Sequence, residues 1–173
     1  MPTKGIRKLS KLKAEINVDV SVENLWKIVS DYEHPSYWSP YIDSAVITSS
    51  VDSGVGATRT CTIPGFGDVE ETISDWSDGV GFSINVEASG PLESARSTIS
   101  VQPSVTGAVA LYETEYSLRE DLTDEEKAST DGYLRTVIAG SLLGLKHFAE
   151  TGRKIGSVLP DEIDSTGIEI TAA

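Results

Sequence analysis

The residues best placed to do chemistry lie on two stretches with alternating polar and apolar side chains, residues 57–63 and 69–76. Because successive side chains of a strand point to opposite faces, strand parity groups Arg59, Cys61 and Ile63 on the first stretch, and Val69, Glu71, Ile73 and Asp75 on the second. If Arg59 and Glu71 meet in an apolar interior, they must pair or bind a polar ligand group, since an unpaired buried charge is costly. A structural salt bridge and a functional dyad both stay open. In the dyad, Glu71 acts as acceptor or general base and Arg59 donates to a ligand oxygen.

Other reactive sites are not expected. His34, His147 and Cys61 have no metal-ligand spacing, so we expect no metal and no cofactor. Arg59 could lower the pKa of Cys61, but a small buried cysteine is the favoured interpretation. The chain has no Gly-x-Ser-x-Gly motif for a nucleophilic serine.

Two glycine pairs, at residues 54–56 and 65–67, resemble phosphate-binding loops only superficially. Neither is followed by a helix or a P-loop lysine, so both are interpreted as hairpin turns. Phe66, at the tip of the second turn, is either a lid over a cavity or a lone exposed aromatic. Gly140 and Gly144, one turn apart in a predicted helix, each cost about 1 kcal/mol against alanine. They indicate room for a ligand or for a closely packed sheet.

Charge and composition restrict the possible partners. The 173 residues carry a net charge of −13, with 39% hydrophobic residues. Five of the 14 basic residues lie within the first 13 positions, so nine remain against all 27 acidic residues. Such an acidic body disfavours nucleic-acid binding. No apolar run approaches the ~18 residues that a membrane span needs, so we expect no stable membrane insertion. A cytoplasmic monomer or weak dimer is the default.

The elements that must position these residues follow a simple order. Residues 11–20 alternate as a strand, and Ser21 caps a short helix that Pro35 ends. Six further strands, joined by short turns, are predicted at residues 42–48, 57–63, 69–76, 80–88, 95–102 and 108–118. A capping box at Thr123 and Glu126 begins a long helix that ends near Gly156, with a possible bend at residues 131–132. Its apolar stripe comprises Leu134, Ile138, Leu142, Leu145 and Phe148.

This order predicts an α+β fold with a seven-stranded, curved antiparallel sheet around the long C-terminal helix. Residues 1–10 are expected to form a basic arm, residues 11–156 the domain, and residues 157–173 an acidic tail that is loose or packs only locally. The inward face of residues 95–102 stays open. A tapered space between sheet and helix becomes a ligand cavity if side chains do not fill it.

Five segments, in this order, resemble the START-like (SRPBCC) superfamily, and most of all its polyketide cyclase/dehydrase and lipid-transport branch. They are residues 21–32, 37–41 (Tyr-Trp-Ser-Pro-Tyr), 54–59, 71–76 and 142–150. The resemblance covers roughly residues 11–155 and implies a helix-grip fold. It also implies that Tyr112 points inward with the Ala110, Thr114 and Tyr116 face. The superfamily hosts carriers, cyclases and receptors, so the activity is not implied.

The expected function is to bind a small, mostly apolar molecule (lipid-, polyketide- or aromatic-like) as a carrier or binding protein. The expected ligand-binding residues are Trp38, Arg59, Cys61, Glu71, Phe82, Tyr112, Tyr116, Leu142, Leu145 and Phe148. The alternative is a cyclase- or dehydratase-like enzyme using Glu71 and Arg59, with Tyr112 assisting. A third hypothesis is an acidic protein-interaction module whose cavity is filled by side chains.

Overall fold

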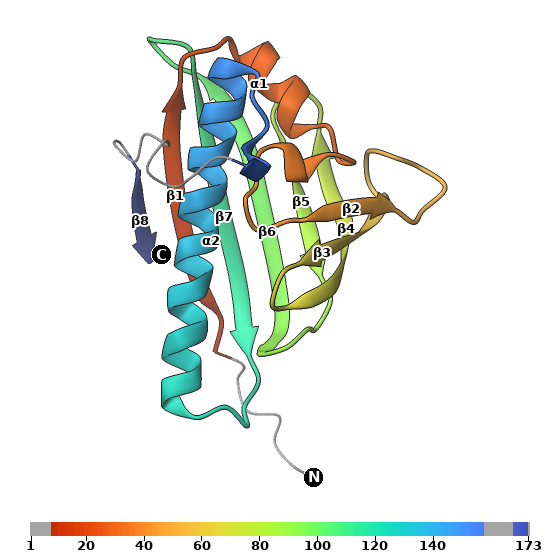
Figure 1. Ribbon diagram of the computed structural model, residues 1–173, viewed down its shortest axis with the longest axis vertical. Coiled ribbons are helices and arrows are strands. Elements are labelled where there is room, and N and C mark those ends of the chain that lie inside the picture. Colours follow the sequence, from red (N-terminus) through yellow and green to blue (C-terminus); the bar gives the residue numbers. More distant parts are fainter. Residues whose placement is uncertain (1–7, 158–167, 173) are drawn as a thin grey trace.

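The computed structural model describes residues 8–157 and 168–172 and has the predicted α+β architecture (Figure 1). The strands are β1 (Ser10–Val18), β2 (Ser44–Ile47), β3 (Thr58–Ile63), β4 (Gly67–Ser77), β5 (Gly81–Val86), β6 (Leu92–Pro103), β7 (Ala108–Leu118) and β8 (Glu169–Ala172). The helices are α1 (Val22–Val29) and α2 (Asp124–Thr151), with short 3-10 turns at Pro35–Tyr37 and Ile155–Ser157. All strand pairs are antiparallel, in the order β2-β3-β4-β5-β6-β7-β1-β8. Figure 1 shows α2 running along the sheet, with α1 beside the C-terminal end of α2.

The eighth strand corrects the predicted tail. Residues 169–172 pair with Leu12–Glu15 of β1, and Ile168 and Ile170 pack against the core, so this part of the tail is neither loose nor only locally packed. β1 has an edge left open by its pairing with β7, and an open edge is a template for another strand. Two isoleucines are too short a pattern to reveal such a strand in the sequence. Residues 1–7 of the predicted arm and 158–167 of the predicted tail lie outside the described residues.

α2 is continuous through Asp131 and Gly132, so the helix does not break there. Asp131 accepts hydrogen bonds from Arg135, one turn later, and from Tyr116 of β7, which hold it within the helix. The capping box forms as predicted, because Thr123 accepts from the Glu126 amide and Glu126 accepts from the Thr123 amide. The helix ends at Thr151, earlier than predicted, where Gly152 has a left-handed φ of 71°.

The strand faces mostly follow the predicted parity. Ala110, Thr114 and Tyr116 of β7 are buried. On β6, whose inward face the sequence did not decide, Ser97 and Ile99 point inward. One assignment is wrong: Asp75 does not share the inward face of Glu71. A β-bulge between Ile73 and Asp75 adds a residue to β4 and turns Asp75 outward, where it pairs with Arg96.

Candidate functional site

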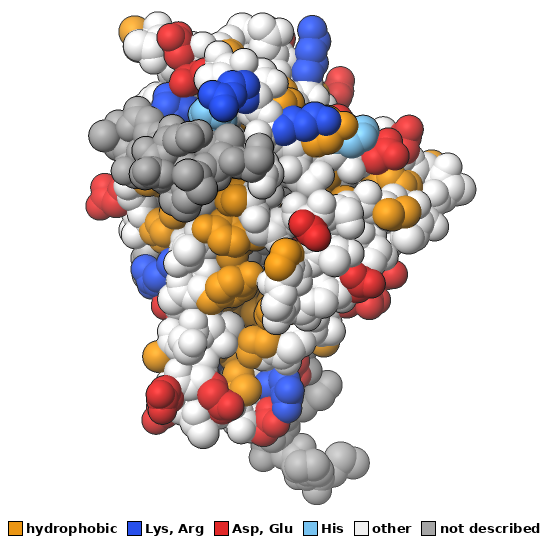
Figure 2. Space-filling model, in the orientation of Figure 1, with side chains coloured by type: hydrophobic (Ala, Val, Ile, Leu, Met, Phe, Trp, Pro, Cys, Tyr) orange, Lys and Arg blue, Asp and Glu red, His pale blue; other side chains and the backbone are white. Residues whose placement is uncertain are grey.

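A cavity of about 140 Å³ lies among residues of the sheet, α2 and the segment that follows α1. Its walls are mainly apolar, with Phe82 and Ile99 from the sheet and Leu134 and Val137 from α2. Figure 2 shows hydrophobic side chains along a band beside α2 on one face of the molecule. The space predicted between sheet and helix therefore exists and is not filled solid.

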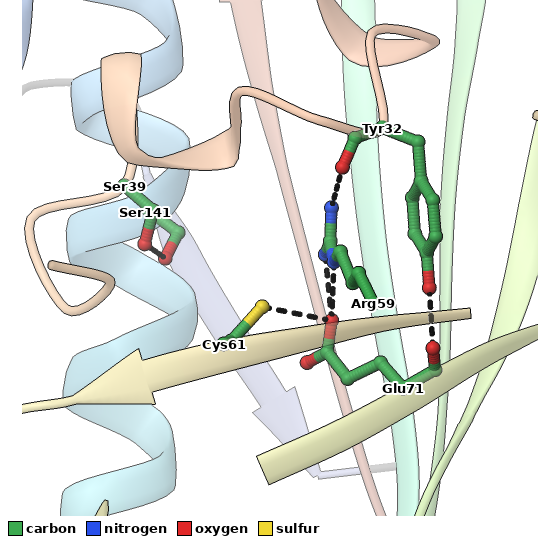
Figure 3. Close-up of polar contacts among 6 residues, drawn as sticks. All are labelled: Tyr32, Ser39, Arg59, Cys61, Glu71 and Ser141. Carbon is green, nitrogen blue, oxygen red and sulfur yellow. Dashed lines mark hydrogen bonds and ion pairs between the residues drawn. The ribbon is translucent and has the colours of Figure 1, made fainter. Parts of the chain in front are cut away.

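Arg59 and Glu71 are direct cross-strand partners on β3 and β4 and form a buried ion pair at the cavity wall (Figure 3). Arg59 Nε and Nη2 donate to Glu71 Oε2 at 2.8 and 2.6 Å. Arg59 Nη1 donates to the Tyr32 carbonyl at 2.8 Å, and the guanidinium lies 4.0 Å from the centre of the Tyr32 ring. The Tyr32 hydroxyl completes the cluster by donating to the Glu71 carbonyl at 2.8 Å. The arginine is thus fixed on three sides.

The electrostatics of this cluster keep Arg59 charged. Burial alone would lower its pKa, but the adjacent Glu71 carboxylate, together with Cys61 and Tyr32, more than offsets this and the pKa is raised. Both side chains are about nine-tenths buried, and a pair in such a place is stable only with good geometry. Two hydrogen bonds on one oxygen, plus the carbonyl partner, provide that geometry.

Cys61 is a structural thiol. Burial, followed by the nearby Glu71 charge, raises the Cys61 pKa to about 12. Its Sγ lies 3.6 Å from Glu71 Oε2, to which the thiol donates. A protonated, buried thiol is a poor nucleophile. Cys61 is therefore better explained as a small buried side chain, and Arg59 does not activate it.

Glu71 keeps one carboxylate oxygen for another partner. Oε2 accepts from Arg59 and Cys61, whereas Oε1 accepts no hydrogen bond from any residue that the structure describes. Figure 3 shows this second oxygen turned away from the guanidinium. A carboxylate oxygen held in an apolar space is a strong acceptor for a hydroxyl or N–H group of a ligand.

Neutral polar groups complete the wall. The hydroxyls of Ser39 and Ser141 lie 3.0 Å apart and are both buried. The indole Nε1 of Trp38 is buried without a hydrogen-bond partner within the described part of the chain. Burial raises the pKa of Tyr112 and Ser97 lowers it by hydrogen bonding, with a net rise, so the phenol stays protonated. These groups can orient a ligand but none is a strong base.

Aromatic rings mark one side of the cavity. Phe66, at the β3–β4 turn, stacks on Tyr133 of α2 with centroids 6.4 Å apart and planes 7° apart. Tyr41 meets Tyr133 edge-on at 6.5 Å, and all three rings line the cavity. Phe66 also packs on Gly90, where an added Cβ would lie 3.1 Å from the ring. Phe66 is therefore not the lone exposed aromatic of the alternative interpretation.

Five of the ten expected ligand-binding residues line the cavity. They are Trp38, Arg59, Glu71, Phe82 and Tyr112. Cys61 lies behind Glu71 instead, and Tyr116, Leu142, Leu145 and Phe148 are not part of the lining.

The position along α2 explains the difference. Leu134, Val137 and Ser141 line the cavity, whereas Leu142 and Leu145, further along the helix, are fully buried in the core. Phe148 packs edge-on against the ring of Tyr37 at 6.0 Å. The apolar stripe predicted from the sequence therefore contacts the ligand space with its first half and the core with its second half.

Sequence reasoning missed Tyr41, Tyr133 and Val137 in the wall, and misjudged what the helix glycines admit. An added Cβ at Gly140 would lie 2.6 Å from the Tyr41 ring, and one at Gly144 would collide with the Trp38 carbonyl. The glycines therefore make room for the segment from Trp38 to Tyr41, not for the ligand or the sheet. The glycine at position 140 was the one sequence feature that indicated a bulky neighbour such as Tyr41 against the helix.

Among the residues described, no three His, Cys, Asp or Glu side chains gather as a metal site, and no helix is long and apolar enough to cross a membrane. A curved antiparallel sheet around a long helix, with an apolar cavity between them, defines a helix-grip protein. The chain belongs to the polyketide cyclase/dehydrase and lipid-transport family, whose model matches residues 10–150. Fold and family support a domain that binds hydrophobic ligands.

Solved structures agree with this fold. The structure of Ara h 8.0201 matches with a TM-score of 0.64 at 15% identity, over 82% of this chain and 98% of that chain. The protein XoxI from Bacillus cereus matches with a TM-score of 0.61 at 19% identity, over 82% and 93% of the two chains. No curated protein sequence matches the chain. These likenesses concern the fold.

Proposed function

We propose that this protein is a carrier or binding protein for a small, mostly apolar molecule, held in the cavity between the sheet and α2. The observation that carries the proposal is the unfilled apolar space of about 140 Å³ within an otherwise packed core. A ligand that enters this space buries its own apolar surface there, which contributes about 25 cal/mol per Å². We further propose that the protein acts in the cytoplasm as a monomer or weak dimer.

The volume restricts the size of the ligand. Engineered apolar cavities of roughly 150 Å³ take up benzene, whereas pockets for drug-sized ligands span roughly 300–1,000 Å³. The cavity of about 140 Å³ therefore fits a single ring or a short branched chain. A longer molecule requires displacement of the Phe66–Tyr133 stack.

The experiment measures binding of small apolar probes by native mass spectrometry and NMR titration, and compares two variants of α2. Val137→Phe fills the cavity from the helix and should abolish binding. Thr136→Phe adds the same ring to the neighbouring exposed position and should leave binding intact. If no apolar probe binds the parent protein, or if both variants bind equally, the proposal is wrong.

A second candidate is a cyclase- or dehydratase-like enzyme in the same cavity. The unoccupied Oε1 of Glu71, in the same wall as Tyr112, favours it. The firm pairing of Oε2 with Arg59 opposes it, since that pairing already gives the carboxylate a structural role. Loss of turnover in both Glu71→Gln and Tyr112→Phe, with substrate binding retained, would support this candidate. Unchanged turnover in Glu71→Gln would remove it.

A further inference from the structure

The cavity wall carries no net charge. Of the described residues that line it, Arg59 and Glu71 are the only ones with ionised side chains, and each neutralises the other. A ligand carboxylate would lose its hydration and find the sole cation already paired. A ligand ammonium could pair with Glu71 only by leaving Arg59 uncompensated. Either ion is therefore disfavoured, because the transfer of an unpaired charge into an apolar interior is costly.

The wall is nevertheless equipped for hydrogen bonding to a neutral group. Oε1 of Glu71 is an acceptor with no donor among the described residues, and the buried Trp38 Nε1 is a donor with no acceptor there. Ser39 and Ser141 share one hydrogen bond, so one of the two hydroxyls keeps a hydrogen to donate. All four residues belong to the lining of the same cavity. A ligand hydroxyl both donates and accepts, and matches this set.

We propose that the cavity selects neutral, hydroxyl-bearing molecules, alcohols or phenols, over the hydrocarbon and the carboxylate of the same skeleton, with Glu71 Oε1 accepting the ligand's hydroxyl hydrogen. This inference rests on the proposed binding function and specifies its ligand class. Glu71 is here a specificity-determining residue. Arg59 acts as a positioning residue, because it holds the carboxylate and cancels its charge.

The test compares three single-ring ligands of similar size: ethylbenzene, benzyl alcohol and benzoate. Their dissociation constants are measured by ¹⁵N–¹H NMR titration of the full chain at pH 7.5. We expect benzyl alcohol to bind at least tenfold more tightly than benzoate and several-fold more tightly than ethylbenzene. Equal binding of ethylbenzene and benzyl alcohol, or tightest binding of benzoate, overturns the inference while leaving the binding function intact. Binding of none of the three contradicts both.

Two variants test whether the ion pair between Arg59 and Glu71 causes the preference for the hydroxyl-bearing ligand. Glu71→Gln leaves Arg59 as an uncompensated cation, so benzoate should gain at least tenfold relative to benzyl alcohol. If that variant does not fold, the double variant Arg59→Met/Glu71→Met, which removes both charges, provides the test. There the ratio of benzyl alcohol to ethylbenzene affinity should fall to about one and benzoate should stay weak. A hydroxyl preference that persists in the double variant contradicts the role given to Glu71.

Discussion

The buried pair between Arg59 and Glu71 makes a quantitative prediction about stability. In Arg59→Met the guanidinium disappears but Glu71 stays in the apolar wall, where, among the described residues, only the Cys61 thiol still donates to its carboxylate. Breaking a buried pair in this way costs about 3–5 kcal/mol. The Tyr32 carbonyl also loses its donor, which adds about 1 kcal/mol. We therefore expect the free energy of unfolding to fall by about 4 kcal/mol or more.

The double variant Arg59→Met/Glu71→Met separates this explanation from a simple loss of packing. Removing both charges leaves no uncompensated ion, and hydrophobic replacement of a buried pair is often neutral or stabilising. Its loss should stay within about 2 kcal/mol, so the two single changes should couple strongly. Urea unfolding followed by circular dichroism measures the wild type, the two single variants and the double variant. The control is that the dependence of the unfolding free energy on urea concentration stays unchanged. If the free energy of unfolding of Arg59→Met falls by less than about 1 kcal/mol, or if the losses of the two single variants add up to that of the double variant, the pair is not buried as the structure shows.

Three further predictions concern the surrounding parts. Because the Cys61 pKa is raised from 9.0 to about 12, the contribution of the thiol to the free energy of unfolding is complete below pH 9 and is lost towards pH 12. The stability advantage of wild type over Cys61→Ala should therefore shrink by about 1.4 kcal/mol per pH unit in that window. A constant difference in alkaline unfolding would contradict this. Gly140→Ala should destabilise the protein, although alanine has the better helix propensity, because the added Cβ collides with the Tyr41 ring. Gly132→Ala, with nothing within 4 Å of the added Cβ, should stabilise the protein by up to about 1 kcal/mol. Equal shifts of the thermal unfolding midpoint in the two variants would be inconsistent with the packing. Phe66→Ala should speed benzyl alcohol dissociation several-fold by removing the stack on Tyr133. Unchanged NMR line shapes would show that this stack does not slow the release of the ligand.

Much of the fold could be predicted because local signals were strong. Perfect alternation in β1 and the Thr123–Glu126 capping box each have a direct physical cause, and both elements form as expected. β8 and the bulge at Asp75 could not be predicted from local pattern. The first depends on an open edge far away in sequence, and the second inserts a residue without a glycine or proline to mark it.

The candidate site was predictable where strand parity decides and less so on the helix. Parity put Arg59 and Glu71 on faces that could meet in the interior, and the structure pairs them directly. On α2, the stripe from Leu134 to Phe148 runs past both the cavity and the core, and sequence spacing does not reveal where along the helix the cavity ends. Leu142 was therefore expected in the wall, whereas the structure places Val137 there. The hydrogen-bonding capacity of Trp38 Nε1 depends on its neighbours, which spacing does not reveal.

The central claim is that an apolar, accessible space lies between the sheet and α2. Xenon enters apolar cavities of this size, and its anomalous scattering locates it directly in a pressurised crystal. The account predicts a xenon peak among Phe82, Ile99 and Val137, which is absent in a crystal of Val137→Phe. Xenon found solely on the outer surface, with side chains filling the interior, would contradict it.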